Sequence, residues 1–145
     1  MDIISDLIKK NRLKKTIFPE EMILKEFQVS QKDFESAQKS FVDENYKWSI
    51  IQSYYAIFHA ARSIIFRSGY REESHTALKI AFKHLYVDTD MISKKTFLAL
   101  ERGMSLREMA DYKETYSQKS AENILFAVND AINEIKAYHD MLTRK

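Results

Sequence analysis

The sequence predicts an all-α protein, an up-and-down antiparallel bundle of four to five main helices. The 145 residues include only two glycines and one proline, which is few for a sheet protein, because sheets use these residues in their turns. Apolar residues recur every three or four positions along most of the chain, and no segment shows a convincing period of two. Both observations favour long helices with few connections.

The composition is that of one ordinary globular domain. Hydrophobic residues make up 45% of the chain and charged residues 30%, and the formal net charge is +2, too small to predict strong nucleic-acid or membrane binding by itself. The lack of cysteine excludes disulfides and thiol nucleophiles. No apolar run reaches the roughly 18 residues of a membrane span, and the first residues do not resemble a signal peptide. We therefore expect a cytoplasmic protein without membrane contact.

The chain is expected to divide into an N-terminal helical arm, residues 1–18, and a single bundle domain, residues 19–145. In the arm, a helix over residues 3–17 would carry a basic run at residues 9–15, either solvated or in contact with phosphate or a partner. Pro19 suits the first turn of the next helix. An apolar stripe follows as far as Phe41, and residues 43–45 break it.

The organising element is a long helix over residues 46–68. Two neighbouring apolar stripes run along it, so other helices must cover it on several sides. A third face is small and polar and carries His59, and small residues let another helix approach closely. Gly69 stands where a glycine commonly ends a helix. The stripes consist of Ile50, Tyr54, Ile57, Ala61 and Ile64, and of Trp48, Ile51, Tyr55, Phe58 and Ile65.

Shorter elements are expected before the last helix. Residues 69–73 are predicted to form a loop, and Ser74 suits the N-cap of a helix that continues through Leu85. After a break at residues 88–90, a short helix over residues 91–102 would end at Gly103. Residues 105–116 would form a helical turn or another short helix. The last helix is expected over residues 117–142.

The sequence contains no local cofactor or metal motif. It lacks a Gly-rich phosphate loop, an H-E-x-x-H and an acidic calcium loop. The four histidines, at positions 59, 75, 84 and 139, include no pair three or four residues apart, which is the spacing of a helical metal clamp. We expect no cofactor and no metal. A Ser-His-Asp arrangement stays open, because its members need not be neighbours in sequence.

Three segments, in this order, resemble the HEPN domain family (higher eukaryotes and prokaryotes nucleotide-binding). They are YYAIFHAA at residues 54–61, the pair Ser74-His75, and LREMADY at residues 106–112. They are similar to the Y-Y-A-x-F-H-A and R-x-x-A-D-Y motifs of small stand-alone prokaryotic and archaeal members. The resemblance covers roughly residues 20–140. It implies a helical bundle, frequently a homodimer, and a ribonuclease or toxin paired with a small nucleotidyltransferase antitoxin.

The resemblance also implies a site, which is incomplete here. Active members carry Arg, four to six residues and then His: the imidazole handles the proton of a ribose 2′-hydroxyl, and the Arg stabilises charge on the phosphate. Arg107 matches this Arg, but Tyr112, Lys113 and Glu114 stand where His should be. Phenol and ammonium groups titrate near pH 10, so neither replaces an imidazole at neutral pH.

Three hypotheses follow. In the first, the protein is a HEPN module with a degenerate or absent ribonuclease motif that binds a nucleotide, RNA or a nucleotidyltransferase through Arg107, Asp111 and Tyr112. In the second, it is a metal-independent ribonuclease toxin with a rearranged site, in which His59 or His75 joins Arg107. In the third, it is a structural helical dimer without a ligand. There Arg107 and Asp111 lock a turn, and Tyr112 and His59 serve packing.

Overall fold

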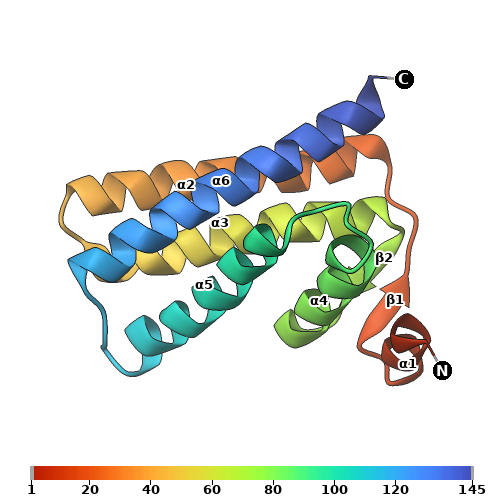
Figure 1. Ribbon diagram of the computed structural model, residues 1–145, viewed down its shortest axis with the longest axis horizontal. Coiled ribbons are helices and arrows are strands. Elements are labelled where there is room, and N and C mark those ends of the chain that lie inside the picture. The colour runs from red at the N-terminus through yellow and green to blue at the C-terminus, as the bar shows by residue number, and fades with distance from the viewer. Residues whose placement is uncertain (1, 145) are drawn as a thin grey trace.

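The computed structural model describes residues 2–144, which fold into a helical bundle with one small pair of strands (Figure 1). This confirms the prediction of an all-α bundle. The elements of this part of the chain are α1 Ile3–Lys9, β1 Leu13–Lys15, α2 Glu20–Val42, α3 Tyr46–Arg67, β2 Tyr70–Glu72, α4 His75–Phe82, the π-helix η1 Lys83–Val87, α5 Lys94–Tyr112 and α6 Gln118–Thr143. None of the helices described here is long and apolar enough to cross a bilayer.

Helix α3 lies at the centre, with α2, α6 and α5 packed along it and α4 at its C-terminal half (Figure 1). Ile50, Ile57 and Ile64 on α3 are fully buried, as the apolar stripe predicted. The small polar face receives α2 and α6 at close range, because Ser49 Oγ donates to the carbonyl oxygen of Ala37 at 2.8 Å. The core therefore surrounds most of α3.

The local signals for helix ends are confirmed at several points. Pro19 is the N-cap of α2, so it directly precedes the first turn in which it was expected. Asn45 accepts a hydrogen bond from the backbone N–H of Trp48 at the start of α3, and Ser74 accepts one from Ala77 at the start of α4. Gly69 has a φ of 85° directly after α3, a left-handed conformation that glycine adopts without strain.

The N-terminal segment differs from the expected single helix over residues 3–17. Helix α1 ends at Lys9, Asn11 adopts a φ of 58°, and the chain then forms β1. This strand pairs antiparallel with β2, Leu13 opposite Glu72 and Lys15 opposite Tyr70, so the loop expected at residues 69–73 is also wrong. Three residues are too few to show a period of two, and so short a pair depends on packing for its stability.

Helix α5 is continuous where two short helices were expected. Gly103 lies inside it and does not end it. A β-carbon at Gly103 would lie 3.4 Å from Tyr54 Cδ1 and 3.6 Å from Tyr54 Cα, so Gly103 marks the point where α5 crosses α3. This crossing sets Arg107, one turn further along α5, beside the neighbouring Tyr55.

Candidate functional site

One stripe of α3 remains partly exposed, and we call it the open stripe: Trp48, Tyr55, His59 and Arg62. These residues fall on one face because they follow each other at steps of seven, four and three. Trp48 is 48% exposed, so the prediction that its apolar stripe is covered is wrong at this end. Charged side chains from α2, β2 and α5 contact the open stripe. On this face an imidazole and a guanidinium of α3 meet solvent.

Arg107 lies flat against the open stripe. Its Nη2 donates to the hydroxyl of Tyr55 at 3.1 Å and lies 3.4 Å from Oδ2 of Asp111. The guanidinium carbon is 5.5 Å from the ring centre of Tyr55 and 5.2 Å from that of Tyr112, both within cation–π range. Its Nε is buried without a hydrogen-bond acceptor in the described part of the chain.

A second arginine shows how incomplete this pairing is. Arg67 gives both terminal nitrogens to Glu20 at 2.7 Å, the short bidentate geometry of a strong ion pair. Arg107 has a single, longer contact with the carboxylate of Asp111, at 3.4 Å. Its side chain is 20% exposed. Its internal pairs therefore leave donor capacity for a ligand.

Asp111 and Tyr112 end α5 beside this guanidinium. The expected packing of Tyr112 against the central helix is wrong, because the residue is 69% exposed. Its ring covers Arg107 on one side and faces solvent elsewhere. The expected Arg107–Asp111 pair is present, as an i, i+4 contact of 3.4 Å within the last turns of α5. An exposed aromatic ring next to a guanidinium is a surface on which a nucleobase can stack.

His59 lies between two acidic residues of α2. Its Nδ1 is 2.6 Å from Oε2 of Glu26, and its Nε2 is 3.8 Å from Oδ2 of Asp33. A carboxylate only accepts hydrogen bonds, so Nδ1–H of His59 donates to Glu26, and the tautomer with its hydrogen on Nδ1 alone has its lone pair on Nε2. Burial raises the pKa of Asp33, and the nearby Glu26 adds to the shift, whereas His59 opposes it. With 22% of its side chain exposed, His59 is a surface residue.

His75 follows the Ser74 N-cap at the start of α4 and is exposed. Its Nδ1 lies 2.6 Å from the hydroxyl of Tyr54, and its ring packs against that of Phe58 with the ring centres 4.2 Å apart and the planes tilted by 36°. Burial of the ring edge lowers the pKa of His75, and the positive charge of Arg107 adds to this effect. The imidazole is thus held at the edge of the core.

Arg62 completes the open stripe with an ion pair to β2. Its Nε lies 3.0 Å from Oε2 of Glu72, which is only 8% exposed. Burial raises the pKa of Glu72, and the Arg62 charge opposes this shift. Arg62 also approaches Glu26 to 4.0 Å. With Arg107 and His75 beside it, the open stripe therefore gathers two guanidinium groups, two imidazoles and four carboxylates, those of Glu26, Asp33, Glu72 and Asp111.

The structure brings the predicted site residues to one surface without joining them. The ring of Tyr55 separates Arg107 from His59, and the ring of Phe58 separates His59 from His75. Sequence reasoning missed Glu26 and Arg62. Arg62 was detectable, because it follows Tyr55 by seven residues and His59 by three on one helix face. Glu26 was not, since its contact with His59 spans 33 residues.

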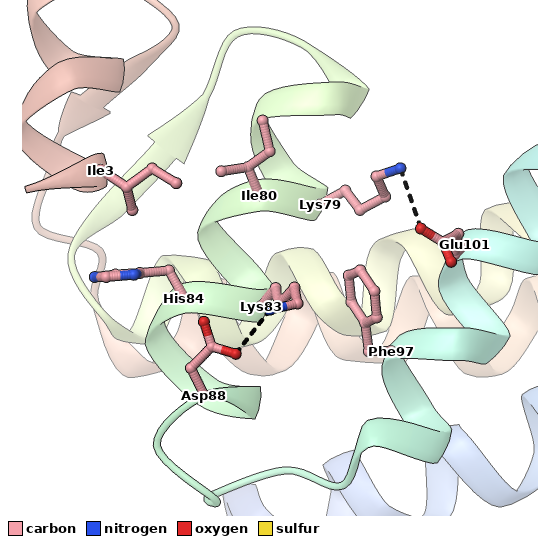
Figure 2. Close-up of a pocket in the computed structure, with 8 residues that line it drawn as sticks. All are labelled: Ile3, Lys79, Ile80, Lys83, His84, Asp88, Phe97 and Glu101. Atoms are coloured by element: carbon pink, nitrogen blue, oxygen red, sulfur yellow. Dashed lines mark hydrogen bonds and ion pairs between the residues drawn. The ribbon is translucent and has the colours of Figure 1, made fainter.

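A separate cavity of about 330 Å³ lies between α1, α4, η1 and α5 (Figure 2). Its two lysines are paired, Lys79 with Glu101 at 3.5 Å and Lys83 with Asp88 at 2.9 Å. None of the predicted site residues lines it. Over residues 2–144, no group of three or more His, Asp or Glu side chains is arranged to hold a metal ion.

Comparison with known proteins supplies two matches. The HEPN domain family matches residues 26–138, a span that contains the open stripe and Arg107. A protein from Methanocaldococcus jannaschii, named as a putative toxin, is 24% identical over 110 residues, which cover 75% of this chain and 82% of that protein. The family match includes most of α2 and all of α3 and α5, the helices that build the site.

Proposed function

This chain belongs to the HEPN domain family, and from that membership we propose that it is a toxin-like module that binds a phosphate group of a nucleotide or of RNA through Arg107, Asp111 and Tyr112. The observation that carries the proposal is the state of Arg107, which is stacked between Tyr55 and Tyr112 and only partly paired. In this function the ribonuclease motif is degenerate, because no His follows Arg107 at the family spacing.

The chemistry of the three residues supports this assignment. A guanidinium is planar and matches two oxygens of a phosphate at once, and stacking on Tyr55 limits the rotation that binding would otherwise have to freeze. Asp111 orients the guanidinium from one turn further along α5. Tyr112 offers an exposed ring to the base attached to that phosphate. The surface therefore suits one nucleotide unit.

Binding of AMP and of a short single-stranded RNA, measured by calorimetry, tests the proposal. Arg107→Ala should weaken binding roughly 10- to 100-fold, the cost of one charge-assisted hydrogen bond. Asp111→Ala should weaken it less, and Tyr112→Ala should remove the stacking contribution. Arg102→Ala is the matched control, because Arg102 is an exposed arginine of the same helix, away from the open stripe. If saturable binding is unchanged in both Arg107→Ala and Asp111→Ala, the proposed site is wrong.

We also propose two protein partners, a second copy of the chain and a small nucleotidyltransferase that acts as antitoxin. Family membership and the toxin name of the M. jannaschii relative support this. Light scattering of the purified protein should give the mass of a homodimer. Co-expression with a nucleotidyltransferase encoded beside this protein should yield a complex and relieve growth inhibition. A monomer that neither inhibits growth nor binds that protein would contradict both partners.

A metal-independent ribonuclease is the second candidate, favoured by the 2.6 Å contact between His59 and Glu26. Glu26 leaves Nε2 of the neutral His59 free to accept the proton of a ribose 2′-hydroxyl. The 2′-oxygen then bonds to phosphorus as the P–O5′ bond breaks, the leaving oxygen takes a proton from water, and Arg107 stabilises the phosphorane charge. RNA cleavage in EDTA that is lost in both Arg107→Ala and His59→Ala would support it. Absence of cleavage by the isolated protein would favour binding alone.

A further inference from the structure

The hydrogen bond between Tyr54 and His75 fixes where the imidazole carries its proton. Tyr54 is 1% exposed, and its hydroxyl lies 2.6 Å from Nδ1 of His75. Burial raises the pKa of the Tyr54 phenol far above its ordinary value, so the phenol keeps its hydrogen. Among the described residues, Nδ1 of His75 is the one hydrogen-bond partner of this hydroxyl, so the phenol donates to Nδ1 and no buried O–H is left without an acceptor. A nitrogen that accepts carries no hydrogen of its own. The neutral imidazole therefore bears its hydrogen on Nε2.

The surroundings also keep His75 uncharged. A second proton would go to Nδ1 and would face the O–H of Tyr54, which would lose its acceptor inside the core. The groups that act on His75 through space are Arg107, Arg62 and His59, and each disfavours another positive charge beside it. His75 is thus a neutral hydrogen-bond donor through Nε2, and this atom makes no hydrogen bond within residues 2–144.

Arg107 and His75 are then two hydrogen-bond donors on one surface, and each has an N–H group without an acceptor in residues 2–144. Arg107 keeps donor capacity beside Tyr55, and His75 lies on the adjacent ring of Phe58. Tyr54 and Tyr55 are consecutive on α3, with ring centres 5.2 Å apart, and one holds His75 while the other holds Arg107. Two consecutive tyrosines of one helix turn therefore position both donors, His75 and Arg107.

We propose that His75 is a second ligand of the phosphate bound at Arg107, donating from Nε2 as a neutral imidazole whose tautomer Tyr54 sets. The inference rests on the proposed function, because it needs an anion at Arg107. It assigns to this protein an imidazole that binds and orients a phosphate and transfers no proton. Both a mononucleotide and an RNA backbone carry this phosphate chemistry.

The tautomer is measurable without any ligand. A long-range ¹H–¹⁵N spectrum of the ¹⁵N-labelled protein at pH 7 should show His75 with hydrogen on Nε2 and none on Nδ1. Addition of inorganic phosphate, AMP or a short RNA should shift the Nε2 signal. His75→Ala should weaken binding about fivefold, the scale of one neutral hydrogen bond, and His75→Gln, which keeps an N–H donor, should restore part of it. His84→Gln is the control, because His84 pairs with Asp2 at 3.1 Å, on the cavity of Figure 2.

The outcomes separate this inference from the function beneath it. Hydrogen on Nδ1, or on both nitrogens, would overturn the inference. So would affinity that falls in Arg107→Ala but not in His75→Ala, a result that leaves the binding function intact. No binding of any of the three probes would overturn both. A loss confined to AMP or to RNA supports the inference and identifies the source of the phosphate. The tautomer is measured on the unaltered protein, so this part of the test does not depend on how any variant folds.

Discussion

Arg67 donates its Nε hydrogen to Nδ1 of His139 across 3.0 Å. The other ring nitrogen of His139 lies 2.8 Å from Ser63 Oγ, and the far edge of the guanidinium binds Glu20. One chain of polar contacts thus joins the start of α2, the end of α3 and the end of α6. His139 is only 2% exposed, so this network has little access to water.

Acid should weaken the fold through this histidine. Burial and the Arg67 charge lower the pKa of His139 from 6.5 to about 4. Above pH 6.5 the ring is neutral in both the folded and unfolded chains, so stability does not change. Between pH 6.5 and about 4 only the unfolded chain takes up the proton, which costs roughly 3 kcal/mol in total at 1.36 kcal/mol per pKa unit. Urea unfolding at pH 7, 5.5 and 4.5 measures this loss.

His139→Gln should flatten that pH dependence, whereas His84→Gln should keep it. Asp33 and Glu72, whose pKa burial raises, act with the opposite sign, since the folded chain binds their protons more readily. They do so in every variant alike, so the difference between variants isolates His139. An equal slope in His139→Gln and the unaltered protein would contradict the assignment.

Gly103→Ala should stabilise the protein by about 0.5–1 kcal/mol, because alanine gains helix propensity over glycine. The added β-carbon would meet Tyr54 Cδ1 at 3.4 Å, an ordinary contact. Gly103→Leu should instead push α5 away from α3, cost roughly 1–3 kcal/mol and separate Arg107 from Tyr55. Thermal unfolding of both variants checks the pair, and a destabilised Gly103→Ala would mean that the crossing has no room for a methyl group.

Leu13→Ala should cost roughly 2–5 kcal/mol, the range for truncating a buried leucine. Leu13 is 1% exposed and belongs to the same core cluster as Leu78 and Phe82. The neighbouring Lys14 lies on the same strand but is exposed, with a surface pair to Glu73 at 3.4 Å, so Lys14→Ala should change stability by less than about 1 kcal/mol. Equal effects of the two substitutions would show that β1 does not anchor the N-terminal segment.

Arg107→Lys should lose most of the AMP affinity that Arg107→Ala loses. An ammonium carries the same charge but has neither the planar fork that meets two phosphate oxygens nor the face that stacks between Tyr55 and Tyr112. Calorimetry at two salt concentrations separates charge from geometry. If lysine restores full affinity, a point charge is sufficient and the stacking has no role in binding.

The sequence by itself determined the helices whose signals are local. Pro19, the Ser74 cap, Gly69 and the apolar spacing of α3 and α6 depend on residues a few positions apart, and each placed an element within one or two residues of its position in the structure. The ordered motifs likewise predicted the family that the comparison shows. They also led to Arg107, Asp111 and Tyr112, the residues of the proposed site.

Only the tertiary structure decided which faces stay open and which distant side chains meet. The pairing of Leu13 with Glu72, the contact of Glu26 with His59 and the bond of Tyr54 to His75 each join separate elements. Gly103 would end a helix by local rules, but it lies inside α5, where that helix packs against Tyr54 of α3. The physical reason is the same in each case. The helical period of the sequence shows which face of a helix is apolar. Which element covers that face depends on packing across the whole bundle.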